Sequence, residues 1–506
     1  MRIAVAAPSP LAVQAALDVA EAEGTAVDAA VAALLVAAST EPGVVSLLGG
    51  AYLAVWPHDG EPEVVDGNVE MPGRGVSPDR LGRGLMEITT SYGGGLTLYA
   101  GPGSVATPGT VAGLGLAHSR HGRLPWSEVV APAVAAARDG YLLGAAAASY
   151  LAITGDSVFG WDPQTRAHLH RPDGTPVGAG ERIVDPDLAQ TLARLAERGP
   201  GDLYDGELAG RLVADLEERG GLVTAADLTA YRAVVRPALR VRAGGWDLGL
   251  NPPPSIGGPV LAVMLRELSR RTGWSTDDVI DIQQVVLGHR VQVHDLARDL
   301  EAAGLDLLEA VERHGLAGLP TSSSTAHVSV VDEQGTACSV TASSGYGSGA
   351  TVPGTGLLLN NCLGEPELNR LGLHALRPGT RLASNMAPTV GRAGSGRVLA
   401  IGSPGADRIT TALLQVLGRH CLDGVDLVDA IEQPRVHVTF AHDGTAQVQL
   451  EEDEELAQSV ARSGLSAVPH PARSMFFGGV GAAYRTAVGE LGAAADQRRE
   501  SATGVS

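Results

Sequence analysis

The sequence predicts a mixed helix–strand fold of the α+β class, spread irregularly over 506 residues. Apolar residues at helical spacing dominate the first two-thirds of the chain, whereas strand-like patterns crowd in after Ser324. The segments do not follow the regular strand–helix–strand repeat of a doubly wound parallel sheet. No internal repeat or low-complexity linker marks a boundary, and the length allows either two to four domains or one large body.

The N-terminal part is expected to hold helices of small residues and one buried strand. Residues 9–40 have apolar side chains at helical spacing, with a break at the Gly-Thr pair 24–25. The stretch SLLGGAYLAVW (46–56) is typical of a buried strand that opens with glycines. A Pro/Gly start followed by a helix is expected at 107–122.

The middle of the chain is expected to be mostly helical. Residues 186–218 have an amphipathic helical pattern, and the glycine pair at 220–221 is a plausible stop. The segment NPPPSIGG (251–258) predicts a rigid turn, because its three prolines fix φ and exclude a helix. Residues 259–316 return to a helical pattern.

The C-terminal part is expected to alternate short strands with short helices. Strands are predicted at His327–Asp332, Ala337–Ala342, Gly356–Leu359 and Val398–Ile401. Helices are predicted at 408–420 and 426–432. The last residues, QRRESATGVS (497–506), are expected to form a frayed tail.

Charge and composition narrow the possible partners. The chain has 37 basic and 57 acidic residues, a net charge of −20, which disfavours nucleic acid and anionic membranes as partners. Three cysteines without a C-x-x-C pair speak against a disulfide framework or a zinc site and fit a reducing compartment. The start lacks a basic segment followed by an apolar one, and the densest apolar run, 29–38, is too short to span a bilayer. We therefore expect a cytoplasmic protein.

The stretch SSSTAHVSVVD, which begins at Ser322, places a row of hydroxyls at the entrance to a predicted strand. A Ser or Thr hydroxyl is a poor nucleophile until a base takes its proton. If the chain is cut between Ser324 and Thr325, the freed α-amine of Thr325, with a pKa of about 8, can serve as that base. The same hydroxyl can attack the carbonyl of Ser324 and convert the amide to an ester, which water then opens. The alternative interpretation is a hydroxyl-rich loop ahead of an ordinary hairpin.

Further motifs occur in one order along the chain. They are GTAVDAAVAA (24–33), SLLGGAYLAVW (46–56), TPGTVAGLGLAHSRHGRLPWSEVVAPAVAAARDGY (107–141), DLYDGELAGRL with GGLVTAADLTAYRAVVRPALR, NPPPSIGG (251–258), STAHVSVVDEQGTACSVTAS (324–343), GLLLNN (356–361), RLASNMAPTV (381–390) and GSPGADRI (402–409). Together they resemble the γ-glutamyltransferase (γ-glutamyltranspeptidase) family of N-terminal-nucleophile (Ntn) hydrolases. For example, NPPPSIGG is similar to the family's PPPSSGG, and STAHVSVVD to its T-T-H-x-S-V-V-D cleavage and nucleophile motif.

The resemblance implies a four-layer αββα sandwich, in which two stacked antiparallel sheets are flanked by helices. It also implies self-cleavage into a large subunit of residues 1–324 and a small subunit of residues 325–506, which intertwine as one structural unit. The expected partners are a small-molecule substrate and the chain's own cleaved subunit in an αβ heterodimer, with a higher oligomer left open. No cofactor is implied, and the 14 histidines include no H-x-x-x-H or H-E-x-x-H metal motif.

The family's catalytic groups can be placed on this sequence one by one. The nucleophile is the Thr two residues before the motif His, here Thr325. A second hydroxyl, which in the family hydrogen-bonds the nucleophile, falls on Ser343. The two backbone N–H groups of the oxyanion hole fall on Gly405 and Ala406, where alanine can serve because the side chain makes no bond. The alternative interpretation of Ser343 is an ordinary hydroxyl at the end of a strand. The alternative interpretation of the GSPGAD segment, which contains Gly405 and Ala406, is a plain Gly-Pro turn.

The groups that hold the glutamyl α-carboxylate in the family are altered here. The family Arg is replaced by Asn68, and its paired serines become Ser384 and Asn385. These side chains can still donate hydrogen bonds, but without the charge, and the last two could instead cap a turn. Arg74 or Arg80 could substitute from the following loop, although the spacing gives no support for this.

The α-ammonium site differs as well. Glu365 stands at the family's Asp position and could pair with an amine. The family Gln has become Cys362, which is expected to pack rather than react. The family Asn has become Gly345, in a shortened loop.

Loss of a bidentate Arg contact removes much of the specificity for a free α-carboxylate. The sequence therefore predicts an autoprocessing hydrolase or transferase that acts on a γ-glutamyl-type amide through an acyl-Thr325 ester, with a substrate other than plain glutathione. One alternative is a relative that hydrolyses a C–C bond next to a carbonyl in natural-product (alkylproline-type) biosynthesis. Another is an unprocessed, non-catalytic scaffold.

Overall fold

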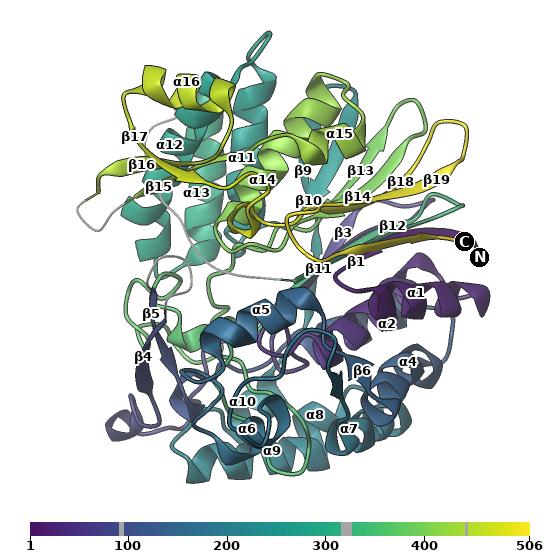
Figure 1. The fold of residues 1–506 in the computed structure, drawn as a ribbon, viewed down its shortest axis with the longest axis vertical. Coiled ribbons are helices and arrows are strands. Elements are labelled where there is room, and N and C mark those ends of the chain that lie inside the picture. Colours follow the sequence, from purple (N-terminus) through teal and green to yellow (C-terminus); the bar gives the residue numbers. More distant parts are fainter. Residues whose placement is uncertain (91–95, 315–325, 441–443) are drawn as a thin grey trace.

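The computed structural model describes residues 1–90, 96–314, 326–440 and 444–506. Two antiparallel sheets lie face to face at the centre, and helices cover both outer faces (Figure 1). The α+β prediction and the four-layer αββα arrangement are thereby confirmed.

The first sheet has seven strands and draws on both ends of the chain. Its strands in spatial order are β20 (Ala502–Val505), β1 (Ile3–Ala7), β11 (Ala326–Asp332), β12 (Ala337–Ser343), β2 (Gly50–Trp56), β3 (Glu63–Gly67) and β8 (Val234–Pro237). All neighbouring strands run antiparallel. The sheet therefore combines strands from both sides of the predicted cleavage point.

The second sheet has six strands and also combines both parts of the chain. Its order is β19 (Leu491–Ala495), β18 (Gly481–Arg485), β14 (Val398–Gly402), β13 (Thr389–Ala393), β10 (Trp246–Leu250) and β9 (Leu239–Ala243). The pairs are again antiparallel. Each sheet thus intertwines the two predicted subunits, while the division at residue 325 itself stays a prediction.

One helical layer covers the seven-stranded sheet. The helices that share its hydrophobic cluster are α1 (Pro10–Glu21), α2 (Ala26–Thr40), α3 (Thr110–His121), α4 (Trp126–Asp139), α7 (Pro186–Arg198), α8 (Asp202–Asp205), α9 (Glu207–Glu218) and α10 (Ala225–Ala230). A smaller cluster beside it holds α5 (Ala145–Thr154), α6 (Pro163–Leu169) and the two-stranded sheet of β6 (Tyr141–Leu142) and β7 (Arg182–Ile183).

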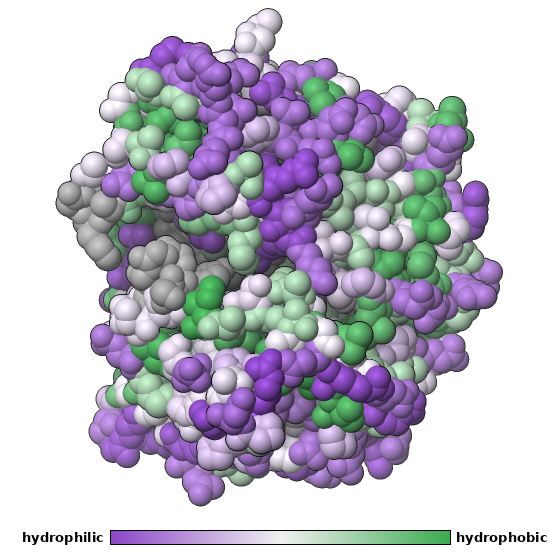
Figure 2. All heavy atoms as spheres, in the orientation of Figure 1, coloured by the Kyte–Doolittle hydropathy of each residue, from purple (hydrophilic) through white to green (hydrophobic). Residues whose placement is uncertain are grey.

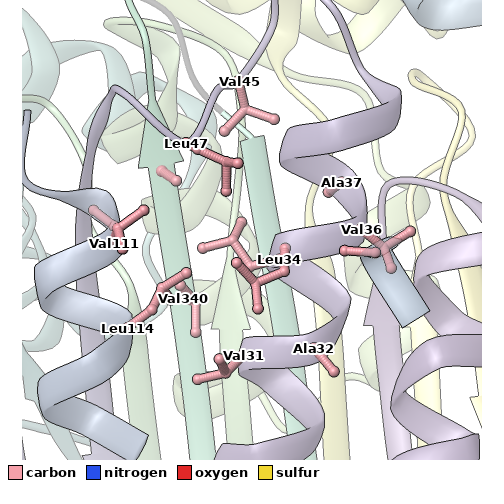
Figure 3. Packing of buried hydrophobic residues seen from close by; sticks show 14 of the residues in the cluster. Val31, Ala32, Leu34, Val36, Ala37, Val45, Leu47, Val111, Leu114 and Val340 are labelled. Carbon is pink, nitrogen blue, oxygen red and sulfur yellow. The ribbon is translucent and has the colours of Figure 1, made fainter. Parts of the chain in front are cut away.

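Helix α2 is the central helix of this layer and is buried almost all round. Its small side chains let it pack closely on the sheet, where Val31 and Leu34 lie close to Val340 of β12 (Figure 3). A capping box starts the helix, because the Thr25 hydroxyl accepts from the Asp28 N–H while the Asp28 carboxylate accepts from the Thr25 N–H. The predicted break at residues 24–25 is therefore confirmed.

The second helical layer covers the six-stranded sheet. Its helices are α11 (Gly257–Ser269), α12 (Thr276–Gln292), α13 (Leu300–His314), α14 (Arg408–Leu417), α15 (Leu427–Glu432) and α16 (Glu454–Ser463). A three-stranded sheet of β15 (Val436–Phe440), β16 (Ala446–Glu451) and β17 (Ser466–His470) packs into the same cluster. A separate hairpin is formed by β4 (Met86–Thr90) and β5 (Leu96–Ala100).

Polar side chains as well as apolar ones join the two sheets. Tyr52 and Met386 belong to an apolar cluster between them. Within it, the Ser339 hydroxyl on β12 donates to the Ile401 carbonyl at 2.9 Å and accepts from the Thr389 N–H at 3.1 Å. These bonds fix how the sheets are aligned.

Two sequence predictions are wrong. Residues 356–359 form no strand; Leu358 makes only an isolated bridge to Thr351, and Gly356 has a left-handed φ of +67°. The expected frayed tail is ordered, because β20 pairs with β1 and Arg498 is buried in ion pairs with Glu451 and Asp496. The order of the tail depends on β1, a partner far away in the sequence.

Hydrophilic residues cover much of the face drawn in Figure 2, and a hollow opens in that face between the two helical layers. None of the described helices combines the length and apolar character that a bilayer span requires.

Candidate active site

Strand ends from both sheets meet at one end of the sandwich. In the first sheet, β11 begins at Ala326 opposite Ala342, and β12 ends one residue later at Ser343. In the second sheet, β13 begins and β14 ends around the pair Thr389–Ile401. Because β12 and β14 contact each other, the loops that leave these strands share one region.

A small pocket in this region, which we call the Glu365 pocket, gathers the residues predicted to bind substrate. It is lined by Asn68, Val69, Ser343, Cys362, Glu365, Leu368, Ala383, Ser384, Asn385 and Met386. The Asn68 amide donates to the Leu382 carbonyl at 2.9 Å, which ties together two segments 314 residues apart. The structure therefore places Asn68, Ser343, Glu365, Ser384 and Asn385 together, while their roles stay predictions.

The predicted nucleophile Thr325 and its neighbour Ser324 lie outside the described residues. The description resumes at Ala326, whose pairing with Ala342 sets the start of β11 beside the strand end that carries Ser343. Ser343 is buried, and its hydroxyl accepts from the Gly345 N–H at 3.1 Å.

Gly345 adopts a conformation that explains why no side chain stands there. Its φ is +66°, and an added Cβ would lie 2.2 Å from Asn361 Oδ1 and 2.9 Å from Glu365 Oε1. Asn361 Oδ1 is itself fixed, because it accepts from the Tyr346 N–H at 2.5 Å. The glycine thus lets Glu365 approach the end of β12.

The predicted oxyanion hole has two buried backbone N–H groups without acceptors. Neither the Gly405 nor the Ala406 N–H donates to another residue in the described part of the chain. Both residues have positive φ, +130° and +66°, and a Cβ on Gly405 would lie 2.6 Å from the Gly478 Cα. Buried N–H groups are rarely left unpaired, and backbone strain of this kind gathers at functional sites.

A buried ionic network behind this loop was missed by the sequence analysis. Asp407 accepts from His437 Nε2 at 3.2 Å and forms an ion pair with Arg408. Burial disfavours the charge of Asp407, but Arg408 and His437 outweigh burial and hold the pKa of the carboxyl below its usual range. Asp407 lies within the motif GSPGADRI, but nothing in the sequence pointed to His437 as its partner.

His327, the motif histidine, is a structural group between the sheets. Its Nε2 lies 2.7 Å from the Ser329 hydroxyl, and its Nδ1 lies 3.0 Å from the Thr341 hydroxyl. Ser329 donates to the Gly481 carbonyl at 3.2 Å, so we assign the imidazole hydrogen to Nε2. Burial lowers the pKa of His327 to about 3, which keeps the ring neutral.

Two pocket side chains have hydrogen-bonding capacity to spare. Asn385 is 3% exposed, and neither of its amide atoms has a partner among the described residues. The Ser384 hydroxyl accepts from the Met386 N–H at 3.3 Å, which is the turn-capping role considered as the alternative. A buried amide without partners is costly unless a ligand or water satisfies it.

No arginine takes the place of the lost family Arg at the described pocket wall. Arg74 pairs with Asp227 at 3.2 Å, and Arg80 approaches Glu217 at 3.8 Å. A further arginine, Arg381, is buried nearby but does not line the pocket. Of the described lining residues, Glu365 alone is charged.

Thiol and metal chemistry find no support in the described residues. Cys362 is packed in a small apolar cluster, and burial raises the pKa of its thiol well above the usual value, with Glu365 adding to the effect. No group of three His, Cys, Asp or Glu side chains is arranged to hold a metal ion in the described part of the chain.

Comparison with known proteins identifies similar chains over nearly the whole length. The family model described as gamma-glutamyltranspeptidase matches residues 12–303 and 289–506. The glutathione hydrolase proenzyme of Escherichia coli (strain K12) is 30% identical over 473 residues, which cover 86% of this chain and 80% of the relative. The acylase ACY 1 proenzyme of Pseudomonas sp. (strain V22) is 30% identical over 505 residues, covering 91% of this chain and 86% of the relative.

Among solved structures, a cephalosporin acylase from Bacillus halodurans has the same fold. It superimposes with a TM-score of 0.80 at 23% identity and covers 99% of this chain and 95% of its own.

We expect His327→Gln to change the acid sensitivity of the fold. The unfolded chain binds a proton at this position below pH ~6.5, whereas the folded chain does not until about pH 3. Stability that is present above pH ~6.5 is therefore lost as pH falls, at up to about 1.4 kcal/mol per pH unit. Urea unfolding from pH 7 to 4 should show the gap between wild type and variant narrowing. A difference in unfolding free energy that stays constant with pH would contradict a buried, neutral His327. The control is His58→Gln, because His58 is exposed.

Gly345→Ala should destabilise the protein by more than its backbone strain alone. A left-handed φ costs a non-glycine residue about 1–2 kcal/mol, and the Cβ would also press on Asn361 and Glu365. Gly396→Ala is the matched control, because Gly396 has a φ of +86° and open space around it. Equal losses in the free energy of unfolding would refute the close approach at Gly345.

Proposed function

Because the chain belongs to the γ-glutamyltranspeptidase family, and is therefore an enzyme of the hydrolase or transferase kind, we propose that it is an autoprocessing amidase that recognises the acyl group of its substrate through an amine. One observation carries the proposal. The Glu365 pocket unites the predicted substrate-binding residues, and Glu365 is the only charged residue among those described in its wall. A carboxylate favours an ammonium group there, and no described cation favours a carboxylate.

Maturation would proceed from the Thr325 hydroxyl. Its Oγ attacks the carbonyl carbon of Ser324, the C–N bond breaks, and the acyl group passes from nitrogen to oxygen. Water then hydrolyses the ester and leaves a free α-amine on Thr325. The two relatives described as proenzymes support such a step.

Turnover would use the same hydroxyl a second time. The α-amine takes the proton of the Thr325 Oγ as it attacks the substrate carbonyl. The N–H groups of Gly405 and Ala406, which have no acceptor among the described residues, would bind the oxyanion. Collapse expels the leaving amine with that proton, and water or a second amine then takes the acyl group from the ester. Ser343 would orient the nucleophile from the adjacent strand end.

The polar wall of the pocket would position the acyl chain. Asn385 has two unpartnered amide atoms, and Ser384 and Asn68 lie beside it. These neutral groups can bind a carbonyl or a hydroxyl but give little selection for a free carboxylate. We therefore propose a substrate other than glutathione, and the likeness to an acylase is compatible with a broader acyl group.

Thr325→Ala should abolish self-cleavage. The wild type should give two fragments that meet between Ser324 and Thr325, and the variant a single chain of 51.7 kDa. The measurement is the denatured intact mass after purification and long incubation. Fragments in the variant, or a different junction in the wild type, would reject Thr325 as the nucleophile.

Glu365→Gln should weaken donors that carry an amine. Loss of a charge-assisted bond costs about 1.5–3 kcal/mol, so KM should rise roughly 10- to 150-fold for an α-amino acyl donor and little for its des-amino analogue. Steady-state kinetics on the matched pair give the answer. Glutathione turnover at an ordinary γ-glutamyltranspeptidase KM would contradict the proposed specificity, and loss of a carbon fragment in place of an amine would favour C–C hydrolysis.

A further inference from the structure

A separate cavity lies in the helical layer that covers the seven-stranded sheet. It is enclosed by the end of α2, by β6, by α6, by the start of α7 and by residues 351–358. Its volume is about 280 Å³. That is close to the lower end of the range of roughly 300–1,000 Å³ that is typical of small-molecule sites. It shares no lining residue with the Glu365 pocket, and we call it the Tyr141 cavity.

Much of the wall of the Tyr141 cavity is apolar. Leu47, Leu188 and Leu357 line it from three different segments, and all three are buried. Ala38 and Pro42 add further apolar surface at the end of α2 and just beyond it. A hydrocarbon group that enters the cavity would therefore be transferred from water to an apolar surface, which is favourable.

A tyrosine hydroxyl without a partner faces this space. Tyr141 lines the cavity and is 5% exposed. Its hydroxyl makes no hydrogen bond to a described residue and is not closed off from solvent, so the exposed part of the side chain includes this oxygen. Burial, with Glu41 and Asp185 adding to the effect, raises the pKa of the hydroxyl. The group therefore stays protonated and can both donate and accept a hydrogen bond.

Asp185 contributes a carboxylate oxygen to the same space. It is 6% exposed, and its Oδ1 accepts from the Leu188 N–H at 2.8 Å as the cap of α7. No described group donates a hydrogen bond to its Oδ2, from which His168 Nε2 is 3.4 Å away. Gly356 leaves this oxygen uncovered, because a Cβ there would lie 2.7 Å from it. Capping thus uses one oxygen of Asp185, and the other is available to a ligand.

The charges around the cavity favour a cation. Its described lining residues include Asp185 and Asp187 but no Lys or Arg, and His168 is the only side chain among them that can carry a positive charge. The start of α7 offers an anion little, because Pro186 has no N–H and the Leu188 N–H is already bonded to Asp185. A metal ion is not favoured either, since the described residues hold no group of three suitable ligands.

We propose that the Tyr141 cavity is a binding site for an aliphatic primary amine. The ammonium group donates hydrogen bonds to Asp185 Oδ2 and to the Tyr141 hydroxyl oxygen, and the hydrocarbon part lies against Leu47, Leu188 and Leu357. This site is additional to the proposed acyl transfer and does not depend on it.

The binding test uses three probes of equal length, n-pentylamine, 1-pentanol and pentanoate. All titrations are made on Glu365→Gln, so that an ammonium group bound at the Glu365 pocket does not enter the readout. In saturation-transfer difference NMR at pH 7, the Kd of pentylamine should be at least about 10-fold lower than that of either other probe, because only the amine makes a charge-assisted bond.

Adding Asp185→Asn should raise the Kd of pentylamine at least about 10-fold and remove its advantage over pentanol. Asparagine caps a helix as well as aspartate does, so α7 should stay intact. Asp453→Asn is the matched control and should leave the Kd unchanged. Asp453 caps α16 by accepting from the Leu456 N–H at 3.0 Å, and it does not line the cavity.

Tyr141→Phe tests the same contact without altering a helix cap. Loss of one neutral hydrogen bond should raise the Kd of pentylamine about 2- to 10-fold and leave that of pentanoate unchanged. Equal affinity for the amine and the alcohol, tighter binding of pentanoate, or no saturable binding of the amine would overturn the proposal. An amine affinity that is unchanged in Asp185→Asn would overturn it as well. None of these results depends on Thr325, so they leave the proposed function to its own tests.

Discussion

The register of β11 is the constraint on which the rest of the site depends. This strand pairs with β1 along one edge and with β12 along the other, so its first residue cannot shift without breaking two ladders. Val328 and Val330 face the helical layer. On the other face, the His327 ring packs against Gly402 of the second sheet, and the Ser329 hydroxyl donates to the Gly481 carbonyl of that sheet. Because side chains alternate along a strand, a slip of one residue would exchange these faces and bury the polar pair among the helices. The position of Ala326, the first described residue of the strand, is therefore determined by packing on both faces of the sheet.

The loop that carries Gly405 and Ala406, the predicted oxyanion-hole residues, follows β14 of the second sheet. A left-handed Ala406 and two N–H groups without an acceptor among the described residues are individually unfavourable, and they persist only when the surroundings hold them. The buried Asp407 supplies that support, since it is anchored to His437 on β15 and to Arg408 at the start of α14. The loop is thus anchored to a strand and to a helix. Donors that are held in place in this way are what the predicted oxyanion hole requires.

The sequence was sufficient to predict those elements whose structure is determined by residues close together along the chain. The break at residues 24–25 follows from a capping box, and β11 and β12 follow from their alternating pattern. Prediction failed where pairing with a distant strand decides. Residues 356–359 have the composition of a strand but pair with no strand of the described chain, and the predicted tail 497–506 contains β20, which pairs with β1. The same holds for the site. The motif resemblance indicated several polar residues that line the Glu365 pocket. It gave no signal for the contact between Asp407 and His437, which joins segments 30 residues apart.

The Glu365 pocket has no arginine or lysine among its described lining residues, and a change of side-chain rotamer would not easily bring one in. Arg381 is the nearest substitute in chemical terms, but its guanidinium is bonded to Asp66 and Glu70 and stacks on Tyr231 at 4.7 Å. Turning it toward a ligand would take one cation from each of two buried carboxylates, and would leave Asp66 with Arg236 at 2.9 Å and Glu70 with Arg74 at 3.7 Å. Removing a partner from a buried ion pair is unfavourable. Among the described residues that line the pocket, Glu365 therefore stays the only charged one, which is the basis of the proposed preference for an ammonium group. The proposed preference thus depends on the ion pair between Arg381 and Asp66, which holds β3 to the loop before β13.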